Sequence, residues 1–262
     1  MKKLIYLCLL LSFFSCKKSD QPSSELAKIV GDYYEEQLKL NPGSATANGD
    51  NRYNDQLNID FTDSHRALVK SVLEKYQASL GSLNRANLNA NDQTTYDLLT
   101  RDIKLGLEGL TYPDNLTPLN QFYGFHLTFA QLGSGQVIQP FKTVKDYEDW
   151  GKRMKKGVAY LDSSIVYFRR GMKQDYVLPK ALVIKMIPQF TSFAVKDVKE
   201  STFYGPLKQF PADFSEADKQ RLTAAYSAAI ENEIMPAYAR LATFLQEEYL
   251  PKARTSTGIS AV

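Results

Sequence analysis

The sequence predicts an all-α fold, an irregular multi-helix bundle with one long aromatic-rich irregular segment. Two observations lead to this prediction. Apolar residues recur at steps of three and four through most of the chain, which is the spacing of one helix face. No stretch of useful length alternates apolar and polar residues as a half-buried strand does. A repeat of about 34 residues, typical of helical-repeat proteins, is also missing from the sequence.

The first predicted helix covers residues 26 to 40. Apolar side chains recur on one of its faces, and these are Leu26, Ile29, Val30, Tyr33 and Leu40. The turn sequence Asn41-Pro42-Gly43 follows and predicts the end of the helix. The polar stretch that comes next, residues 44 to 60, contains Asn-Gly and Gly-Asp steps and predicts turns.

Two more helices and an irregular segment follow. The second helix is expected to start near Thr62 or Asp63, and the third near Asn91. Their apolar positions are Val69, Val72, Leu73, Tyr76, Leu80 and Leu83 in the second, and Tyr96, Leu99, Ile103, Leu107 and Leu110 in the third. Residues 111 to 141 follow no steady period and hold prolines and glycines among aromatic side chains. They predict a long irregular segment with room for one short helix.

The fourth helix has the strongest pattern. Thr143 and Asp146 have the spacing of a capping box, in which each side chain bonds to the backbone of the other and closes the first turn. Apolar residues then follow at alternating steps of three and four, which predicts a buried stripe. This stripe consists of Tyr147, Trp150, Met154, Val158, Leu161, Ile165, Phe168 and Met172.

Two further helices complete the predicted fold. The fifth begins at Pro179, a favourable first-turn residue. Its buried positions are Val183, Ile187 and Phe190. The sixth begins at Ser215 and carries an apolar stripe from Leu222 to Leu245. Pro236 lies inside this last helix and predicts a kink, because proline removes a backbone donor and crowds the preceding turn.

Residues 1 to 16 resemble a bacterial lipoprotein signal. Two lysines form a positive start, and Leu4 to Phe14 is an apolar run too short to span a bilayer. Ser15 then precedes Cys16. We expect cleavage before Cys16 and attachment of lipid to its thiol. The alternative is an ordinary secretory signal with a chance cysteine.

This interpretation sets the domain organisation and the location. Residues 1–15 are the predicted signal peptide, residues 16–24 a lipidated tether, and residues 25–262 one helical domain. The tether is polar and contains Pro and Ser, which is typical of a flexible linker. The residue after Cys16 is Lys17 and not the aspartate that favours retention in the inner membrane. We therefore expect an exported protein that is anchored through its lipid, with the outer membrane favoured.

Composition argues against several functional classes. Both cysteines, Cys8 and Cys16, belong to the signal region or its boundary. The mature domain therefore offers no disulfide, thiolate metal site or cysteine nucleophile. The formal net charge is +3, and it falls close to neutral when Lys2 and Lys3 leave with the signal. Because a basic surface is missing, we expect no nucleic-acid partner.

The histidines and short motifs do not form a catalytic set. His65 follows a helix start on a polar face and is expected to be solvated. His126 lies in "QFYGFHLTFAQ" and is expected to be buried among aromatic rings and hydrogen-bonded, in a structural role. No His-Glu-x-x-His helix occurs, and "GSG" at 133–135 lacks the strand–turn–helix context of a nucleophile elbow. We therefore predict no catalytic residue, metal site or cofactor in this chain.

Three blocks of the sequence resemble the bacterial family called domain of unknown function 885. They are "LKLNPGSATANGDNRYNDQL", "FKTVKDYEDWGKRMKKGVAYLDSSIVYFRRGMKQDYVLPKALV" and "EIMPAYARLATFLQEEYLPKARTSTGIS". They come in the family's order and cover most of residues 25 to 262. The resemblance implies a mainly helical, often exported protein. Family members are roughly twice this length, and their C-terminal half carries a His-Glu…Pro-Gly-His segment similar to a zinc metallopeptidase site.

This resemblance implies that the chain corresponds to the N-terminal half of such a protein. No zinc ligand of the family has a matching position here, so zinc is expected only in full-length relatives. His126 and Arg254 are the candidate cleft-lining residues, and in this chain alone Arg254 is expected to be exposed to solvent. Part of the Leu222–Leu245 stripe is expected to lie bare without the other half, which would leave the domain marginally stable and prone to self-association.

Three functions remain open. The first is a non-catalytic helical half of a metallopeptidase-like lipoprotein, which shapes a substrate cleft together with a C-terminal half. The second is a free-standing periplasmic or surface lipoprotein that binds peptide or glycan, because aromatic residues make up 12% of the chain. The third is a nutrient-binding lipoprotein of the helical-repeat kind, which the lack of repeats disfavours.

Overall fold

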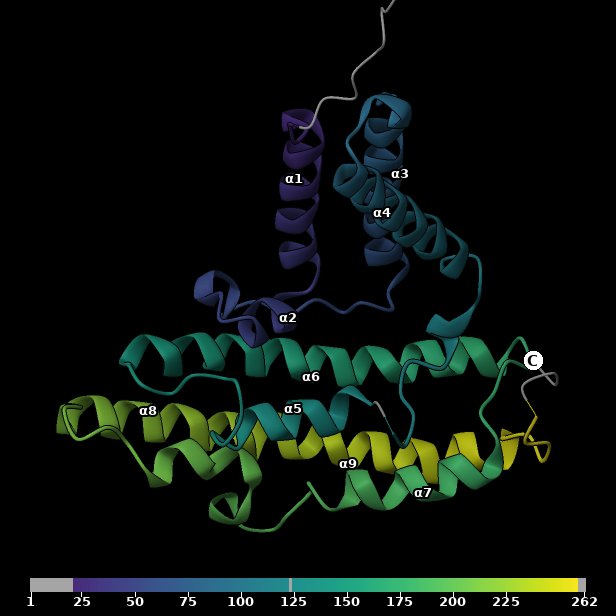
Figure 1. Ribbon diagram of the computed structural model, residues 1–262. Helices are drawn as coiled ribbons and strands as arrows, with labels where there is room; N and C mark the ends of the chain where they lie inside the picture. Colours follow the sequence, from purple (N-terminus) through teal and green to yellow (C-terminus); the bar gives the residue numbers. More distant parts are fainter. Residues whose placement is uncertain (1–20, 123, 259–262) are drawn as a thin grey trace, which may run out of the picture.

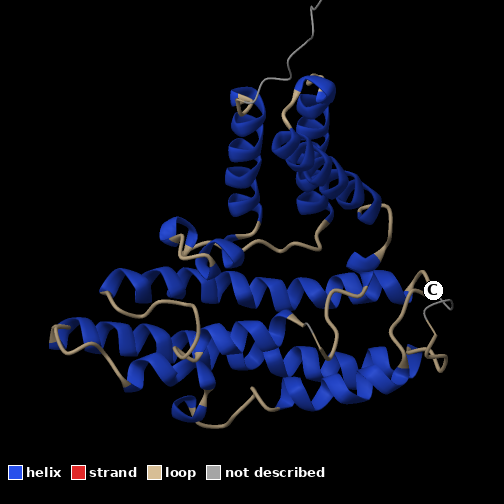
Figure 2. Cartoon of the chain, in the orientation of Figure 1, coloured by secondary structure: helices blue, strands red, loops and turns tan. Residues whose placement is uncertain are grey.

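The computed structural model describes residues 21–122 and 124–258. The predicted signal peptide, Cys16 and the first residues of the tether lie outside the described residues. The described chain is built from helices and loops, with no strand beyond a single isolated bridge (Figure 2). The predicted all-α multi-helix fold is confirmed.

Three helices form the upper layer in Figure 1. They are α1 (Ser24–Leu40), α3 (Asp63–Gly81) and α4 (Ala90–Gly109). Each follows a polar cap, because the side chains of Ser23, Thr62 and Asn89 accept a hydrogen bond from a backbone N–H of the first turn. The layer has a core of its own, which consists of Leu26, Leu40, Val72, Leu73, Tyr76, Leu80, Leu88 and Ile103. The helix starts predicted near Thr62 and Asn91 are confirmed.

The turn-rich stretch after α1 contains more helix than the sequence predicts. Pro42 ends α1 as expected, but it also opens a short helix, α2 (Pro42–Ala47). Proline fits the first turn of a helix because its missing N–H has no partner to lose there. The next element in the chain is a short 3₁₀ turn, η1 (Asn51–Tyr53).

Further short 3₁₀ turns lie between the other helices and after the last one. They are η2 (Arg85–Asn87), η3 (Asp114–Leu116), η4 (Val198–Glu200), η5 (Thr202–Lys208) and η8 (Leu250–Lys252).

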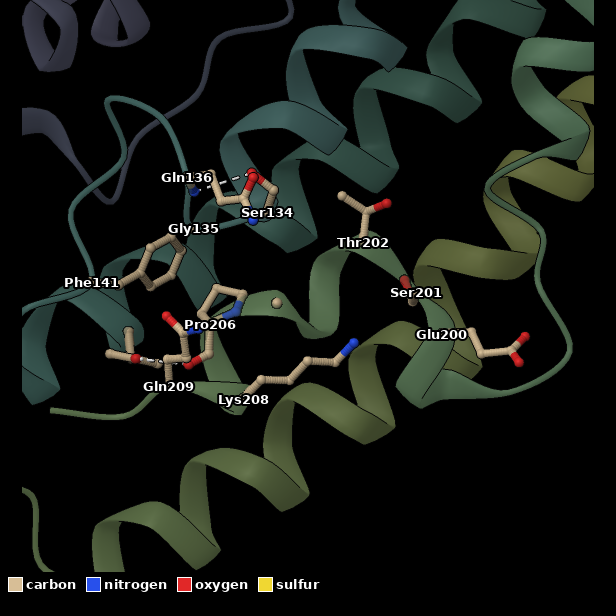
Figure 3. Close-up of a pocket in the computed structure, with 12 residues that line it drawn as sticks. Ser134, Gly135, Gln136, Phe141, Glu200, Ser201, Thr202, Pro206, Lys208 and Gln209 are labelled. Atoms are coloured by element: carbon tan, nitrogen blue, oxygen red, sulfur yellow. Dashed lines mark hydrogen bonds between the residues drawn. The ribbon is translucent and has the colours of Figure 1, made fainter. Parts of the chain in front are cut away.

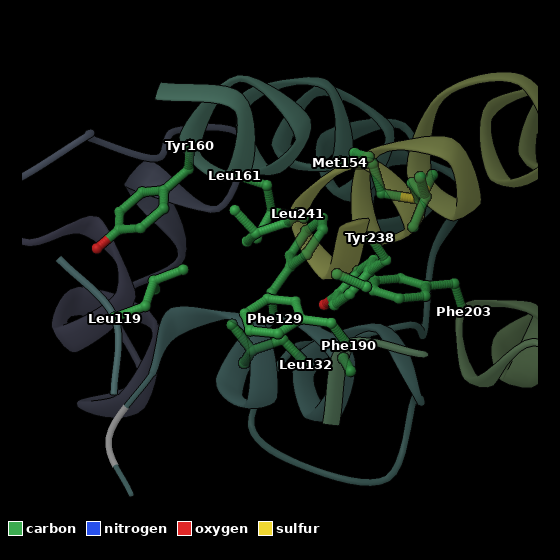
Figure 4. Close-up of a cluster of buried hydrophobic side chains, with 14 of the residues drawn as sticks. Leu119, Phe129, Leu132, Met154, Tyr160, Leu161, Phe190, Phe203, Tyr238 and Leu241 are labelled. Atoms are coloured by element: carbon green, nitrogen blue, oxygen red, sulfur yellow. The ribbon is translucent and has the colours of Figure 1, made fainter. Parts of the chain in front are cut away.

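Five helices form the lower layer and contain the larger core. They are α5 (Phe125–Gly133), α6 (Val144–Met172), α7 (Lys180–Thr191), α8 (Glu216–Ala229) and α9 (Met235–Phe244). Side chains from α5, α6, α7, α9 and η5 meet in this core, among them Phe129, Leu161, Phe190, Phe203 and Tyr238 (Figure 4). The capping box predicted for Thr143 and Asp146 opens α6. The irregular segment 111–141 holds α5, the one helix of length that it was expected to accommodate.

The last predicted helix forms one helical stretch, in which α-helical and π-helical segments alternate. A wider π-helical turn, Ile230–Ile234, separates α8 from α9, and a second one, Leu245–Tyr249, follows α9. Pro236 comes directly after the first of them. A proline ring crowds the carbonyl four residues earlier, and a wider turn relieves this contact. Where the sequence predicts a kink at Pro236, the structure thus has a π turn just before the proline.

The apolar stripe of this last helical stretch is covered within the chain. Its members Leu222, Tyr226, Ile230, Ile234, Tyr238, Leu241 and Leu245 are all at most 2% exposed. Helices α6 and α7 and the η5 turn pack against it. The expectation that part of this stripe lies bare is therefore wrong, and the low stability inferred from it loses its basis.

A buried arginine joins the two layers. Arg153 lies on α6 and is 1% exposed. Its guanidinium donates hydrogen bonds to five acceptors, which are the backbone carbonyls of Pro42, Tyr53 and Gln56 and the side-chain oxygens of Thr46 and Gln139. Four of them belong to the segment that runs through α2 and η1. The segment is thereby fixed across the top of α6.

Candidate functional site

A surface pocket of about 380 Å³ lies where three segments of the lower layer meet (Figure 3). The loop after α5 (134–136) forms one wall, Phe141 before α6 contributes a ring, and residues 200–209 around η5 form the other wall. The segments are far apart in the sequence, and only the packing of α5 against η5 brings them together.

Two glycines allow this close approach. Gly135 has a φ of +75°, a left-handed conformation that glycine adopts without strain. Gly205 faces the same loop from η5, and a Cβ there would lie 2.3 Å from the backbone oxygen of Ser134. A side chain at position 205 would therefore push the two walls apart. The pocket owes its shape to backbones in direct contact.

The pocket combines polar and apolar groups. Phe141 and Pro206 offer apolar surface, and exposed side chains at the rim include Gln136, Thr202 and Lys208 (Figure 3). The Ser134 hydroxyl already donates to the carbonyl of Gln131 at 2.7 Å and accepts from the N–H of Gln136. That serine is therefore a loop-closing residue. A ligand would find hydrogen-bonding groups around a partly apolar floor.

Tyr147 closes the pocket from below in a structural role. Its hydroxyl donates to the carbonyl of Pro206 at 3.0 Å, and its own carbonyl accepts from the hydroxyl of Tyr226 at 2.8 Å. Burial raises the pKa of Tyr147 to about 12, so the phenol stays protonated at neutral pH. It holds η5 and α8 against the first turn of α6.

His126 lies beneath the surface at the start of α5. The residue is 0% exposed, and its ring stacks on Phe190 with centroids 4.1 Å apart. Nε2 pairs with Oε1 of Gln189 at 3.1 Å, and the carbonyl of His126 accepts from Tyr238. Burial lowers the pKa of His126 to about 4. The prediction of a buried, hydrogen-bonded histidine is confirmed.

Arg254 holds the segment after the last helix against α7. The N–H of Lys180 donates to its carbonyl at 2.8 Å, and its own N–H donates to Leu178. Its guanidinium donates to the carbonyls of Val177 and Gly258 at 3.0 and 2.9 Å. Arg254 is half-buried, so the expectation of a solvent-exposed side chain is wrong. The carbonyls of Val177 and Leu178, just before α7, accept hydrogen bonds from Arg254.

The structure does not bring His126 and Arg254 together. His126 contacts Gln189 and Phe190 at the end of α7, whereas Arg254 pairs with Pro179 just before its start. The ten residues between these positions span about 15 Å of helix. The two candidates therefore lie near opposite ends of α7.

His65 is less exposed than the sequence suggests. It lies in the first turn of α3, is half-buried, and burial lowers its pKa. In the described part of the chain, no three His, Cys, Asp or Glu side chains lie where they could share a metal ion. None of the described helices combines the length and hydropathy needed to cross a bilayer.

The comparisons with known proteins agree with this fold. A family model described as "Bacterial protein of unknown function (DUF885)" matches residues 42–261. The chain belongs to this family. The match includes α2, the Arg153 segment, the pocket and Arg254. A search of the curated proteins found no match.

A solved structure has the same architecture. It is described as "the putative lipoprotein from Colwellia psychrerythraea" and superposes with a TM-score of 0.74 at 16% sequence identity. The superposition covers 90% of this chain and 42% of the other. At this identity the likeness shows the fold alone. The DUF885 chain thus spans less than half the length of that protein.

Proposed function

We propose that this DUF885 protein is the helical portion of an exported lipoprotein, and that it shapes one side of a substrate cleft. The observation that carries the proposal is the difference in coverage, because the same fold accounts for 42% of a longer protein. On this proposal the described helices form a scaffold, and a further, metallopeptidase-like portion supplies the chemistry. This portion would follow the segment that Arg254 fixes beside α7.

The lipid anchor of the proposal rests on two supports. A sequence that resembles a lipoprotein signal directly precedes Cys16, and the solved protein with the same fold is described as "the putative lipoprotein from Colwellia psychrerythraea". An outer-membrane location is the finer part of the proposal and rests on Lys17 alone. Helix α1 would place the body of the protein beyond a short polar tether.

Replacing the anchoring cysteine tests the anchor. The wild-type protein should fractionate with membranes, and Cys16→Ser should move it to the soluble envelope fraction. Lys17→Ser is a matched control, because it keeps the thiol. A wild-type protein recovered unlipidated in the soluble fraction would remove the lipoprotein part of the proposal.

A free-standing binding protein is the second candidate. The pocket of Figure 3 favours it, because an aromatic ring and uncharged polar side chains such as Gln136 and Gln209 suit a glycan or a peptide. Screening the mature protein against glycans and short peptides by calorimetry tests it, with Gly205→Ala as the variant that distorts the pocket wall. Saturable binding that Gly205→Ala abolishes would favour this candidate over the scaffold.

A further inference from the structure

A second cavity lies on the lower layer, in a groove between α6 and α8. It has a volume of about 260 Å³ and is separate from the pocket of Figure 3, although Tyr147 contributes to both. Met154, Leu222 and Tyr226 form its floor, and all three are buried. The Tyr226 hydroxyl is already bonded to the backbone of Tyr147. The floor is therefore apolar, with its polar atom satisfied.

Small residues on the facing helices keep the groove open. Gly151 lies on α6, and Ala225 and Ala229 lie one turn apart on α8. A Cβ built at Gly151 would meet no atom within 4 Å. The space next to this glycine is therefore open, and an alanine side chain would fit there without a clash.

The rim of the groove is mostly basic. Arg221 is held by Glu148 at 2.9 Å and by Asp218 at 3.1 Å. Lys152 faces Asp55 and Asp149 at 3.3 and 3.7 Å.

Lys155 is a further cation at the rim. Among residues 21–122 and 124–258, no side-chain acceptor is bonded to Lys155, which is exposed at the rim. With Glu148 neutralised by Arg221, the groove presents an apolar floor beside a free ammonium group. A ligand of matching chemistry has an alkyl part and one negative charge.

We propose that the groove between α6 and α8 binds a fatty-acid-like carboxylate, with the alkyl chain over Gly151 and Met154 and the carboxylate at Lys155. An alkyl chain suits the groove because the floor between the two packed helices is apolar, and the ammonium group of Lys155 matches a single head group. The proposal is independent of the function proposed above. It concerns a different surface and needs no additional polypeptide.

Binding of saturated fatty acids to the mature Cys16→Ser protein tests the proposal by calorimetry. Dodecanoate below its micelle concentration should bind with one site. From octanoate upward, affinity should rise about fourfold with each added methylene until the groove is full. Dodecyltrimethylammonium, which has the same chain and the opposite charge, should bind at least tenfold more weakly.

Two variants locate the site. Gly151→Leu should abolish dodecanoate binding, because leucine fills the groove, and the fold should persist because leucine is a better helix former than glycine. Lys155→Met should weaken binding two- to fivefold, the range of an exposed ion pair, whereas the neighbouring Lys156→Met should leave it unchanged. Dodecanoate binding that survives Gly151→Leu would overturn the proposal. Equal affinity for dodecanoate and dodecyltrimethylammonium would also overturn it. The same holds if the protein binds an acidic apolar peptide but no dodecanoate.

Discussion

Nη2 of Arg153 lies 2.7 Å from Oγ1 of Thr46, although the two residues are 107 positions apart in the chain. Both side chains are buried. The Thr46 hydroxyl accepts from Arg153, and a second contact at 2.8 Å joins it to Oδ1 of Asn54. A single α6 side chain thus organises the segment that links the two helical layers.

Replacing Arg153 should destabilise the protein strongly. Burial lowers the pKa of the guanidinium to about 10, so it remains charged at neutral pH. Arg153→Met would leave three buried acceptors, on Pro42, Thr46 and Gln139, without this donor, at about 1 kcal/mol or more each. We expect a loss of about 3 kcal/mol, which corresponds to about 6–12 °C in Tm for a domain of this size. Thermal unfolding followed by circular dichroism measures it.

The neighbouring surface lysine is the control for this prediction. Lys156→Met changes the same helix at an exposed position and should shift Tm by no more than about 2 °C. Equal Tm values for Arg153→Met and Lys156→Met would show that the buried network contributes little to stability.

Stability should fall as the pH drops from 6.5 towards 4. The pKa of His126 is about 4 in the folded protein and 6.5 as the ordinary value, so the unfolded chain binds its proton first. The stabilisation is fully present above pH 6.5 and is lost as the pH falls through this window. This difference between the two pKa values of His126 corresponds to about 3 kcal/mol in the free energy of unfolding. Urea unfolding at a series of pH values measures the slope.

His126→Gln should flatten this pH dependence, because glutamine does not titrate. His65→Gln is the matched control. It should remove only a small part of the pH dependence of stability, because His65 is half-buried. If the pH dependence between 4 and 6.5 is the same in His126→Gln as in the wild type, the titrating group lies elsewhere.

Two glycines of α6 should respond to alanine in opposite directions. A Cβ at Gly157 would lie 2.2 Å from Cζ of Phe129, which is buried in the core. Gly157→Ala should therefore cost about 1–3 kcal/mol through overpacking. Gly151 has open space, so Gly151→Ala should gain about 0.5–1 kcal/mol from helix propensity. Chemical denaturation of both variants measures the difference, and equal effects would contradict the packing described here.

Removing the Arg254 side chain should loosen the segment after the last helix. Arg254→Ala loses the bonds to Val177, Ser256 and Gly258 and keeps the two backbone bonds beside α7. Hydrogen exchange should become faster at residues 253–258 and stay unchanged in α9. Arg240→Ala, which breaks only a surface ion pair with Asp162, is the control. Unchanged exchange at 253–258 would mean that the backbone bonds alone hold this segment.

Local features of the fold could be predicted from the sequence because their causes are local. The capping box at Thr143 and Asp146, the cap at Thr62 and the buried stripe of α6 each depend on residues within a few turns. At Pro236 the sequence predicts a kink, whereas the structure has a π turn before the proline. Whether a proline yields a kink or a π turn depends on the packing around it.

Long-range features could not be predicted in the same way. The sequence marks Leu222–Leu245 as an apolar stripe, but it does not reveal that α6 and α7 cover it. The pocket joins Gly135 and Gly205, which are 70 positions apart. The position of Arg153 is itself a signal in the sequence, because it stands between Trp150 and Gly157 on the buried face of α6. A charged residue at such a position predicts a buried polar network.

The mass of the native protein, purified from membranes of the source cells, tests the central claim most directly. Intact mass spectrometry should find a chain that begins at a lipidated Cys16 and exceeds the 29.6 kDa of the present sequence, because the helical portion is proposed to work with a further portion. A monomeric, unlipidated protein no heavier than 29.6 kDa would contradict both the anchor and the shared cleft.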